Sequence, residues 1–560
     1  MNRWLLKHRR VLGVVLGTSL LPTRAPAAVQ AAAPERPRLV LAIVVDQFRY
    51  DFLERFGEHF GPGGFSRLLD GGAVFINAKF TYMPNYTAAG HATIFTGSVP
   101  AYDAIVGNAW FDRELGRVRG AVSDSAAYLL GLGGRAAEPG AASPRTLEGV
   151  TIGDQMRLAT QLASKVVALS YKDRSAVLPG GRRPNGAYWF STRTGEFVSS
   201  DYYFAELPVW VRRFDASERP DRYFGAKWEL ALPADAYRRR PNLPAEQSQL
   251  GGDFPYVVNG GIEAPGPEFY SAFELTPFAS DHLAVFAIAA VEGESLGADE
   301  ATDLLAVSFS SPDLIGHLYG PDSREVEDSF VRLDRTLARL LDDVDRRVGL
   351  ERCVVFLTGD HGVAPVPEYL VSLGIDAGRV TGNEVQAAAE GALKARFGAG
   401  ERWIQAFVND QLYLDRRRLA QKRIDPREAE RVAGEAVLAI PGVAAYYTRS
   451  QILEGMLPEG PLAARVTSGF HAARSGDVWL VTRPFYMISE WEGGTTHGSS
   501  YGYDTHVPLV LFGVGIRPGR YADAASPSDI APTLAALLGI EAPPQAVGRV
   551  LSEALAGITR

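Results

Sequence analysis

The sequence predicts an α/β fold in which a central, mostly parallel sheet carries helices on both faces. Three observations lead to this expectation. Continuous apolar runs recur along the chain and suit strands that are buried on both sides. A long amphipathic helix separates two of these runs and completes a strand–helix–strand unit. Several runs end in acidic residues, and functional groups in open α/β sheets gather at that end of the strands.

The expected core elements can be taken in chain order. The strands are residues 38–46 (RLVLAIVVD), 303–313 (DLLAVSFSSPD), 353–361 (CVVFLTGDH) and 506–513 (HVPLVLFG). Residues 323–349 are expected to form the intervening helix, because its apolar side chains fall on one stripe: Val326, Phe330, Leu333, Leu337, Leu340, Leu341 and Val344. Gly349 ends that helix. Residues 528–540 (SDIAPTLAALLGI) predict a further covering helix, with Gly539 as its terminator.

Two inserted cap segments are expected to interrupt this core, at about residues 180–280 and about 367–475. The first is rich in Pro, Arg and aromatic residues, and its residues 185–200 (NGAYWFSTRTGEFVSS) predict a hairpin over the edge of the sheet. The second contains the helix-like stretches EVQAAAEGALKARF and PREAERVAGEAVLAI and predicts an α+β unit. Residues 28–560 outside the insertions are expected to form the catalytic domain.

The first 27 residues have the features of a signal peptide. A basic start and the apolar run VLGVVLGTSLL precede Ala25-Pro26-Ala27, a set of small residues that suits signal peptidase. An uncleaved anchor is the alternative, but the run is shorter than the roughly 20 apolar residues that cross a bilayer. We therefore expect residues 1–27 to be removed and the protein to be periplasmic or secreted, with no stable membrane anchor.

Composition narrows the classes of function. The formal net charge is −8, with 65 acidic against 57 basic residues, so no nucleic-acid binding is expected. Cys353 is the single cysteine, which excludes an internal disulfide and a cluster of thiolate ligands for zinc. Ligands for a transition metal would have to be histidines and carboxylates. The oligomeric state is left open, and a monomer is compatible with the sequence.

Thr87 lies where the extended stretch TYMPNY gives way to the helical run TAAGHATIF. A threonine at a helix start is usually an N-cap. Asn85, Tyr86 and Thr87 also form an N-glycosylation sequon, which would place them on a surface loop. The third interpretation is a nucleophile, because a helix start offers a positive dipole end and free N–H groups to an anion beside the hydroxyl. The stretch alone leaves all three open.

Acids and histidines gather at the ends of the predicted core strands or in the loops that follow them. They are Asp46, Asp313, His317, Asp360, His361 and His497. Asp313 and His317 have the spacing that places two side chains on one helical face. Taken singly, such pairs are more often helix-surface or turn-capping residues than ligands. Jointly they supply nitrogen and oxygen ligands that suit two zinc ions. His506 is a rival to His497, and spacing does not choose between them.

These motifs together resemble those of the alkaline phosphatase superfamily, and specifically of its PafA-type, phosphate-irrepressible monoesterase branch. The match follows chain order across nearly the whole mature chain. It rests on Asp46, Thr87, GHATIFTGSVPAYDAIVGN, Asp313 to His317, GDHG, THGSSYGYDTHVP and DIAPTLAALLGI. The resemblance implies an alkaline phosphatase-like fold and an exported, zinc-dependent hydrolase that acts on small phosphate monoesters with a broad substrate range.

The resemblance also implies roles for individual residues. One zinc ion would be held by Asp313, His317 and His497. The other would be held by Asp46, Asp360, His361 and the Thr87 oxygen. Thr87 would be the nucleophile that forms a phospho-threonine intermediate. The branch's phosphate-binding groups match Asn108, Lys172 and Arg174. Because His497 stands in a stretch that resembles the family's THGS motif, the resemblance favours His497 over His506 as the zinc ligand.

Two alternative functions stay open. Related diesterases keep the threonine and the zinc ligands but lack the Lys-x-Arg pair, so a phosphodiesterase or nucleotide pyrophosphatase on the same core is the enzyme alternative. Without the resemblance, Lys172 and Arg174 would be a solvated pair in the charged loop YKDRS. A metal-stabilised binding or scaffold protein without turnover is the alternative from another class.

Overall fold

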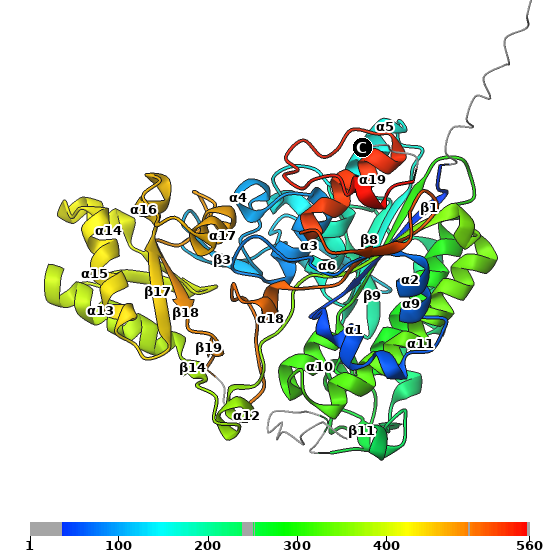
Figure 1. The fold of residues 1–560 in the computed structure, drawn as a ribbon, viewed down its shortest axis with the longest axis horizontal. Helices are drawn as coiled ribbons and strands as arrows, with labels where there is room; N and C mark the ends of the chain where they lie inside the picture. The colour runs from blue at the N-terminus through cyan, green and yellow to red at the C-terminus, as the bar shows by residue number, and fades with distance from the viewer. Residues whose placement is uncertain (1–35, 238–249, 251–252, 491–492, 557–560) are drawn as a thin grey trace, which may run out of the picture. The chain divides into compact units, whose positions relative to one another are not determined.

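An 11-stranded sheet forms the centre of the fold (Figure 1). The computed structural model describes residues 36–237, 250, 253–490 and 493–556. The expected signal peptide lies outside these described residues. In spatial order the strands are β21 (Gly519–Tyr521), β2 (Ala73–Phe75), β20 (Leu509–Gly513), β13 (Cys353–Gly359), β1 (Leu39–Val45), β12 (Asp303–Phe309), β7 (Val166–Ser170), β8 (Gly186–Ser191), β9 (Glu196–Ser200), β5 (Tyr128–Gly131) and β6 (Gly134–Pro139).

The middle of this sheet is parallel. Strands β13, β1, β12, β7 and β8 pair with their neighbours in parallel, whereas β20 and β9 join antiparallel on either side. Every residue of β1, β12 and β13 is buried, as the continuous apolar runs require. The predicted class, a mostly parallel α/β sheet of the alkaline phosphatase type, is therefore confirmed.

Alternate residues of β1 pack into different cores, which shows that helices cover both faces. Leu39, Leu41 and Ile43 belong to the core that includes α11 (Arg324–Arg347) and α9 (Pro277–Gly293). Val40, Ala42 and Val44 belong to the core on the other face. The helices of that second core are α3 (Thr87–Thr96), α5 (Ile152–Ala159) and α19 (Ile530–Leu538). The two expected covering helices correspond to α11 and α19.

Part of the first expected insertion belongs to the central sheet. The hairpin expected in residues 185–200 is present as β8 and β9, but β8 pairs in parallel with β7 and so extends the sheet instead of lying over its edge. The side chains of β8 explain this, because nearly all of them are buried. The remainder of the segment contains α7 (Val209–Ser217), β10 (Ala226–Trp228), β11 (Tyr256–Val258) and α8 (Pro267–Glu274).

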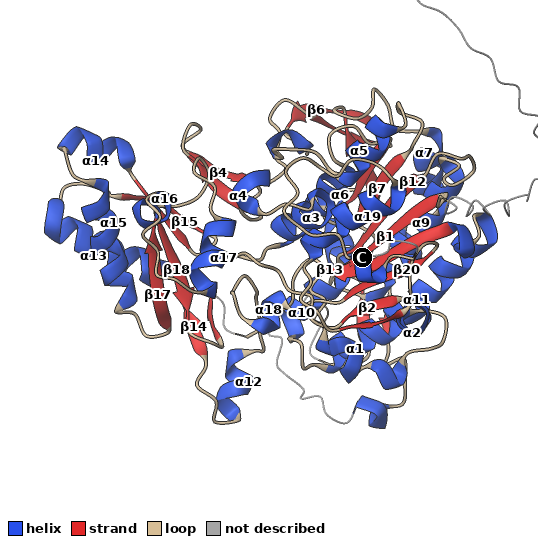
Figure 2. Cartoon of the chain, turned by 45° about the horizontal axis from the view of Figure 1, so that its top comes forward, coloured by secondary structure: helices blue, strands red, loops and turns tan. Residues whose placement is uncertain are grey.

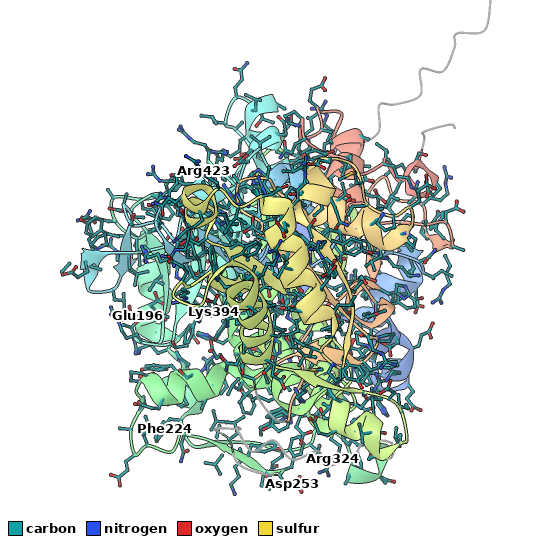
Figure 3. All side chains as sticks on the ribbon, turned by 90° about the vertical axis from the view of Figure 1, so that its left-hand side faces the viewer. Glu196, Phe224, Asp253, Arg324, Lys394 and Arg423 are labelled. Atoms are coloured by element: carbon teal, nitrogen blue, oxygen red, sulfur yellow. The ribbon has the colours of Figure 1, made fainter. Side chains whose placement is uncertain are left out.

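The second expected insertion contains a sheet of its own. Its strand order is β15 (Ile404–Val408), β16 (Gln411–Leu414), β18 (Val478–Thr482) and β17 (Val443–Thr448). Figure 2 shows these strands in red, with α13 (Gly382–Phe397), α14 (Arg416–Lys422) and α15 (Pro426–Leu438) beside them. In Figure 3 the labels Lys394 and Arg423 mark α13 and the end of α14. The strand β18 begins just beyond the expected boundary at residue 475, because it completes this sheet.

Among the described residues, no single helix is both long and apolar enough to cross a membrane. Helices α8 and α9 meet the length and composition criteria only as a pair bent by 91°. Most of the apolar side chains of α9 are buried against the central sheet.

Candidate active site

Three neighbouring parallel strands bring the predicted acids to one edge of the sheet. Val45 at the end of β1 is in register with Phe309 of β12 and with Gly359 of β13. Asp46 and Asp360 directly follow two of these residues, and Asp313 lies in the first turn of α10 (Ser311–Tyr319), just after β12. Adjacent parallel strands that end at the same level place their next residues side by side. The three carboxylates therefore meet although they are far apart in sequence.

The predicted ligands form two overlapping groups of buried side chains. One consists of Asp46, Asp360 and His361, and the other of Asp313, His361 and His497, with the ligand atoms within 4.8 Å of one another in each. His317 joins the second group through its Nε2 atom, which lies 3.2 Å from Asp313 Oδ1. The rings of His361 and His497 stack with their centroids 3.5 Å apart. All six predicted acids and histidines are thus in one cluster.

Each histidine of the cluster is oriented by a contact of its Nδ1 atom. These atoms face backbone carbonyl oxygens, at 2.8 Å for His317 and Thr495, 2.9 Å for His361 and Gly362, and 2.8 Å for His497 and Asn85. A carbonyl oxygen can only accept, so Nδ1 carries a proton, and Nε2 is the ring atom that faces the cluster. This is the arrangement that orients histidine ligands in metal sites.

Two carboxylate oxygens of the cluster favour the binding of a cation. Asp46 Oδ1 and Asp360 Oδ2 are buried and have no hydrogen-bond partner among the described residues. Buried carboxylate oxygens without a partner are costly, and a metal ion would satisfy them. Nitrogen and oxygen donors of this kind fit zinc. The residues present therefore suit a metal pair, with His361 between its two halves.

Thr87 is the first residue of α3, and its hydroxyl faces the cluster. Thr87 Oγ1 lies 3.3 Å from His361 Nε2, and the residue is 1% exposed. The N-cap is Tyr86, which has no side-chain capping bond, so the N-cap interpretation of Thr87 is wrong. The sequon does not lie on a surface loop either, because Asn85 is fully buried and donates to the Ser499 carbonyl at 3.0 Å.

His506 lies outside the cluster. Its ring stacks on Tyr50 at 4.5 Å, and its Nε2 atom faces the carbonyl oxygen of Ile76 at 3.0 Å. His497, by contrast, has its Nε2 atom 3.8 Å from Asp313 Oδ1. The choice between the two histidines that sequence spacing left open is resolved by their positions in the fold.

Comparison with known proteins adds an independent observation. The type I phosphodiesterase / nucleotide pyrophosphatase family model matches residues 40–504. The chain is 36% identical over 551 residues to alkaline phosphatase PafA of Elizabethkingia meningoseptica, an alignment that covers 97% of this chain and 98% of PafA. The chain belongs to the PafA-type branch of the alkaline phosphatase superfamily.

Further matches agree with this PafA-type membership. Alkaline phosphatase PhoV of Synechococcus elongatus is 34% identical over 529 residues, which cover 93% of each chain. The crystal structure of wild type PafA matches with a TM-score of 0.87 at 35% identity, over 94% of this chain and 100% of that chain.

Two of the three residues that the PafA-type resemblance implies for phosphate binding contact the cluster or the start of α3. Lys172 Nζ lies 2.6 Å from Asp46 Oδ2 and 2.5 Å from Asp313 Oδ2, so it bridges the two ligand groups. Asn108 Oδ1 accepts a hydrogen bond from the Ala88 N–H at 2.9 Å, which fixes the amide beside the start of α3. The Arg174 side chain is partly exposed, and its buried Nε has no partner among the described residues.

Sequence reasoning missed two residues that contact this PafA-type cluster. Gln47 has a positive φ of 64°, donates its backbone N–H to Asp360 Oδ1 at 3.1 Å, and donates Nε2 to Asp313 Oδ1 at 2.7 Å. His91 lies one turn after Thr87 and contacts its carbonyl oxygen at 2.8 Å. Gln47 directly follows Asp46, and His91 is within the GHATIFTG motif, so proximity to motif residues was the available signal.

Burial and charge set the ionisation around the cluster. Burial alone would lower the pKa of Lys172, but the carboxylates of Asp313 and Asp46 outweigh it and raise that pKa. Lys172 is therefore a cation at neutral pH. Burial lowers the pKa of His91 to about 4. Since His91 is neutral, it acts through hydrogen bonds and not as a charge.

Proposed function

We propose that the chain is an exported, zinc-dependent alkaline phosphatase that hydrolyses small phosphate monoesters through a phospho-threonine intermediate, with a broad substrate range. The chain is an enzyme of the phosphoric monoester hydrolase class. The observation that carries the finer proposal is the Thr87 hydroxyl, 3.3 Å from His361 Nε2 and beside two buried ligand groups that Lys172 bridges. Export rests on the predicted signal peptide, and the mature enzyme would be periplasmic or secreted.

Two zinc ions per chain are part of this proposal. Asp313, His317 and His497 would hold one of them, and Asp46, Asp360, His361 and the Thr87 oxygen would hold the other. When bound, the ions would lower the pKa of the threonine hydroxyl and of a water molecule and would offset the charge of the phosphate. The unpartnered oxygens of Asp46 and Asp360 support this assignment.

Thr87 acts as the nucleophile in the first step. Its Oγ1 loses its proton and forms a bond to phosphorus as the bond from phosphorus to the leaving oxygen breaks, with the two oxygens in line. The departing oxygen takes up a proton and leaves as the alcohol. The start of α3 favours the negative charge of the phosphate, because a helix N-terminus carries a partial positive charge. The leaving alcohol departs opposite Thr87, on the side of His497, Asp313 and His317.

In the second step a water molecule attacks the phospho-threonine from the side that the alcohol has left. The water loses a proton as its oxygen forms a bond to phosphorus, the bond from phosphorus to Thr87 Oγ1 breaks, and Oγ1 regains a proton, which restores the hydroxyl. Asn108, Lys172 and Arg174 donate to the phosphate oxygens in both steps. These donors match a transition state that spreads its charge over three equatorial oxygens.

The cationic pair Lys172 and Arg174 favours monoesters. A monoester carries a further unmasked oxygen, whereas a diester replaces it with a second ester group that cannot accept two charged donors. A phosphodiesterase or nucleotide pyrophosphatase is the second candidate function, since the family model that matches residues 40–504 bears that description. Substrate preference decides between the two.

The deciding experiment compares kcat/KM for p-nitrophenyl phosphate and for methyl p-nitrophenyl phosphate, on protein whose zinc content is measured in the same sample. We expect a strong monoester preference, which Lys172→Ala reduces because it removes a donor that only the monoester needs. Lys394→Ala is the matched control, because Lys394 is an exposed residue of helix α13, which lies beside the second sheet. A diester preference would favour the pyrophosphatase function.

Thr87→Ala tests the nucleophile. We expect kcat to fall on the order of 10³-fold or more, with thermal unfolding little changed. Zinc content is measured in the same sample, because the Thr87 oxygen is one of the proposed ligands. Undiminished activity of this variant would rule out the phospho-threonine mechanism. No turnover of either ester by the wild-type protein with two zinc ions per chain would favour a scaffold protein instead.

A further inference from the structure

The turn between β15 and β16 connects the second sheet to the active site. It consists of Asn409 and Asp410, whose φ angles of 52° and 59° are those of a tight two-residue hairpin turn. Asn409 Nδ2 donates to the carbonyl oxygen of Ala109, next to the phosphate-binding residue Asn108. A Cβ atom at Gly107 would come within 2.3 Å of Asn409 Nδ2, so glycine is required for this contact. The turn is thus fitted against the loop that carries Asn108.

Asp410 lines a small pocket at this junction. The pocket has a volume of about 20 Å³, and its other walls include Tyr86, His497, Tyr503 and Asp504. Tyr86 directly precedes the nucleophile, and His497 belongs to the ligand cluster. The volume suits one group the size of a water molecule or an ammonium ion. A ligand group in this pocket would therefore contact two residues that border the site, Tyr86 and His497.

The polar groups of the pocket favour a cation. Asp504 is 1% exposed, and its Oδ1 has no hydrogen-bond partner among the described residues, while its Oδ2 accepts from the Ser499 N–H at 2.8 Å. Within the described part of the chain, neither Asp410 nor Asp504 forms an ion pair with a Lys or Arg. Burial, and then the charges of Asp410 and Asp504, raise the pKa of Tyr86 well above its usual value, so both carboxylates act on its hydroxyl.

We propose that this pocket, between Asp410, Asp504 and Tyr86, binds a primary ammonium group on the leaving alcohol, so that the enzyme favours phosphate esters of amino alcohols. The proposal rests on the proposed phosphatase function. The leaving alcohol departs toward His497, which is also a wall of the pocket. Carboxylates and tyrosine rings together are a suitable environment for an alkylammonium. A trimethylammonium group would exceed the small volume.

The test compares three substrates near pH 8, where a primary amine is protonated. They are 2-aminoethyl phosphate, its uncharged analogue 2-hydroxyethyl phosphate, and phosphocholine. For the wild-type protein we expect kcat/KM to be about tenfold higher for the aminoethyl ester than for the hydroxyethyl ester. This corresponds to about 1.4 kcal/mol. Phosphocholine is expected to show no such advantage.

Asp410→Asn and Asp410→Gly should bring the aminoethyl to hydroxyethyl ratio close to one. Both replacements tolerate the positive φ of the turn, so folding is preserved. Glu435→Gln is the matched control, because it removes a carboxylate from an exposed ion pair on helix α15 and should leave the ratio as in the wild type.

The outcomes separate the two proposals. A wild-type ratio near one, a ratio that persists in both Asp410 variants, or an equal advantage for phosphocholine would overturn the ammonium site while leaving the phosphatase intact. Loss of the aminoethyl preference on adding potassium or sodium ions would show that an inorganic cation is the true occupant, which also overturns it. No hydrolysis of any of the three esters would overturn the phosphatase function itself.

Discussion

His91 links Thr87, the proposed nucleophile, to Asp360, a proposed metal ligand. It is fully buried, its Nδ1 lies 2.8 Å from the Thr87 carbonyl oxygen and 3.4 Å from Asp360 Oδ2, and its Nε2 lies 2.8 Å from Ser308 Oγ. These contacts hold the first turn of α3 against the ends of β12 and β13. The position of the Thr87 hydroxyl relative to His361 therefore depends on a residue that touches neither substrate nor reacting atoms.

We expect His91→Ala to lower kcat/KM about 10- to 100-fold and to weaken zinc binding, because outer contacts orient the ligands and the nucleophile. Steady-state kinetics and competition with a zinc chelator measure the two effects. His506→Ala is the control, since it also removes an imidazole packed inside the fold but lies outside the cluster. Wild-type zinc affinity together with wild-type kcat in His91→Ala would contradict this role.

Asp103 makes the stability of the protein dependent on pH. It is fully buried at the end of α4 (Pro100–Asp103), and burial raises its pKa to about 7. The folded state thus holds the proton more tightly than the unfolded state does. This contribution to stability is present at acid pH, and it is lost as the pH rises through about 7.

Asp103→Asn should therefore raise the free energy of unfolding at about pH 8.5, on the order of 2–4 kcal/mol, with little change near pH 4. The asparagine oxygen can still accept from the Ile105 N–H, as Asp103 Oδ1 does at 2.9 Å. Denaturant unfolding at the two pH values measures the difference. Asp342→Asn, at an exposed ion pair with Arg67, is the control. An equal effect at both pH values would refute the prediction.

At the level of residues, the predicted ligands could be found from sequence because strand ends and local spacing mark them. Asp46 and Asp360 directly follow apolar runs, and Asp313 precedes His317 by one helical turn. Gln47 and His91 could not be found in this way. Their contacts to Asp313, Asp360 and Ser308 depend on strands that pair only in the folded chain.

Helix α3 packs against β13 more closely than most side chains would permit. Gly90 is the third residue after Thr87. A Cβ atom at this position would come within 2.1 Å of the Asp360 carbonyl oxygen. The backbone of the helix that begins at Thr87 thus packs directly against the backbone of Asp360. The distance from Thr87 to the ligand cluster is fixed by this contact between two elements.

Gly90→Ala should separate α3 from β13 and lower both stability, by about 1–3 kcal/mol, and kcat/KM, by about 100-fold. Gly391→Ala is a matched control in α13, where a Cβ atom would meet nothing within 4 Å. That control should instead stabilise the protein by about 0.5–1 kcal/mol, since alanine is the better helix former. Thermal unfolding and turnover of both variants test this, and normal activity of Gly90→Ala would contradict it.

Helices and strands with a regular pattern of apolar residues were predictable from the sequence. Which strand each one pairs with was not. The stripe of α11 and the apolar runs of β1, β12 and β13 follow from local pattern. The hairpin β8–β9 was also evident from its sequence, but its pairing with β7 was not, because that register depends on burial of both of its faces. Thr87 was expected as a helix start and is the first helical residue, with Tyr86 in the capping position.

Over the whole molecule, the buried carboxylates tie stability to metal content. Asp46, Asp313 and Asp360 lie together at one edge of the central sheet and repel one another when they are ionised. Zinc that binds only the folded state would add stability by mass action. Chelation should therefore lower the melting temperature on the order of 5 °C or more, and added zinc should restore it. An unchanged melting temperature after verified metal removal would contradict this.

The turn of Asn409 and Asp410 has a consequence for how such enzymes diversify. Positive φ angles confine these positions largely to asparagine, aspartate and glycine. Codons for aspartate differ by single bases from those for asparagine and for glycine. A single mutational step could therefore add or remove the negative charge at position 410 without altering any proposed metal ligand. If Asp410 selects substrates as proposed, selectivity could change while the chemistry is retained.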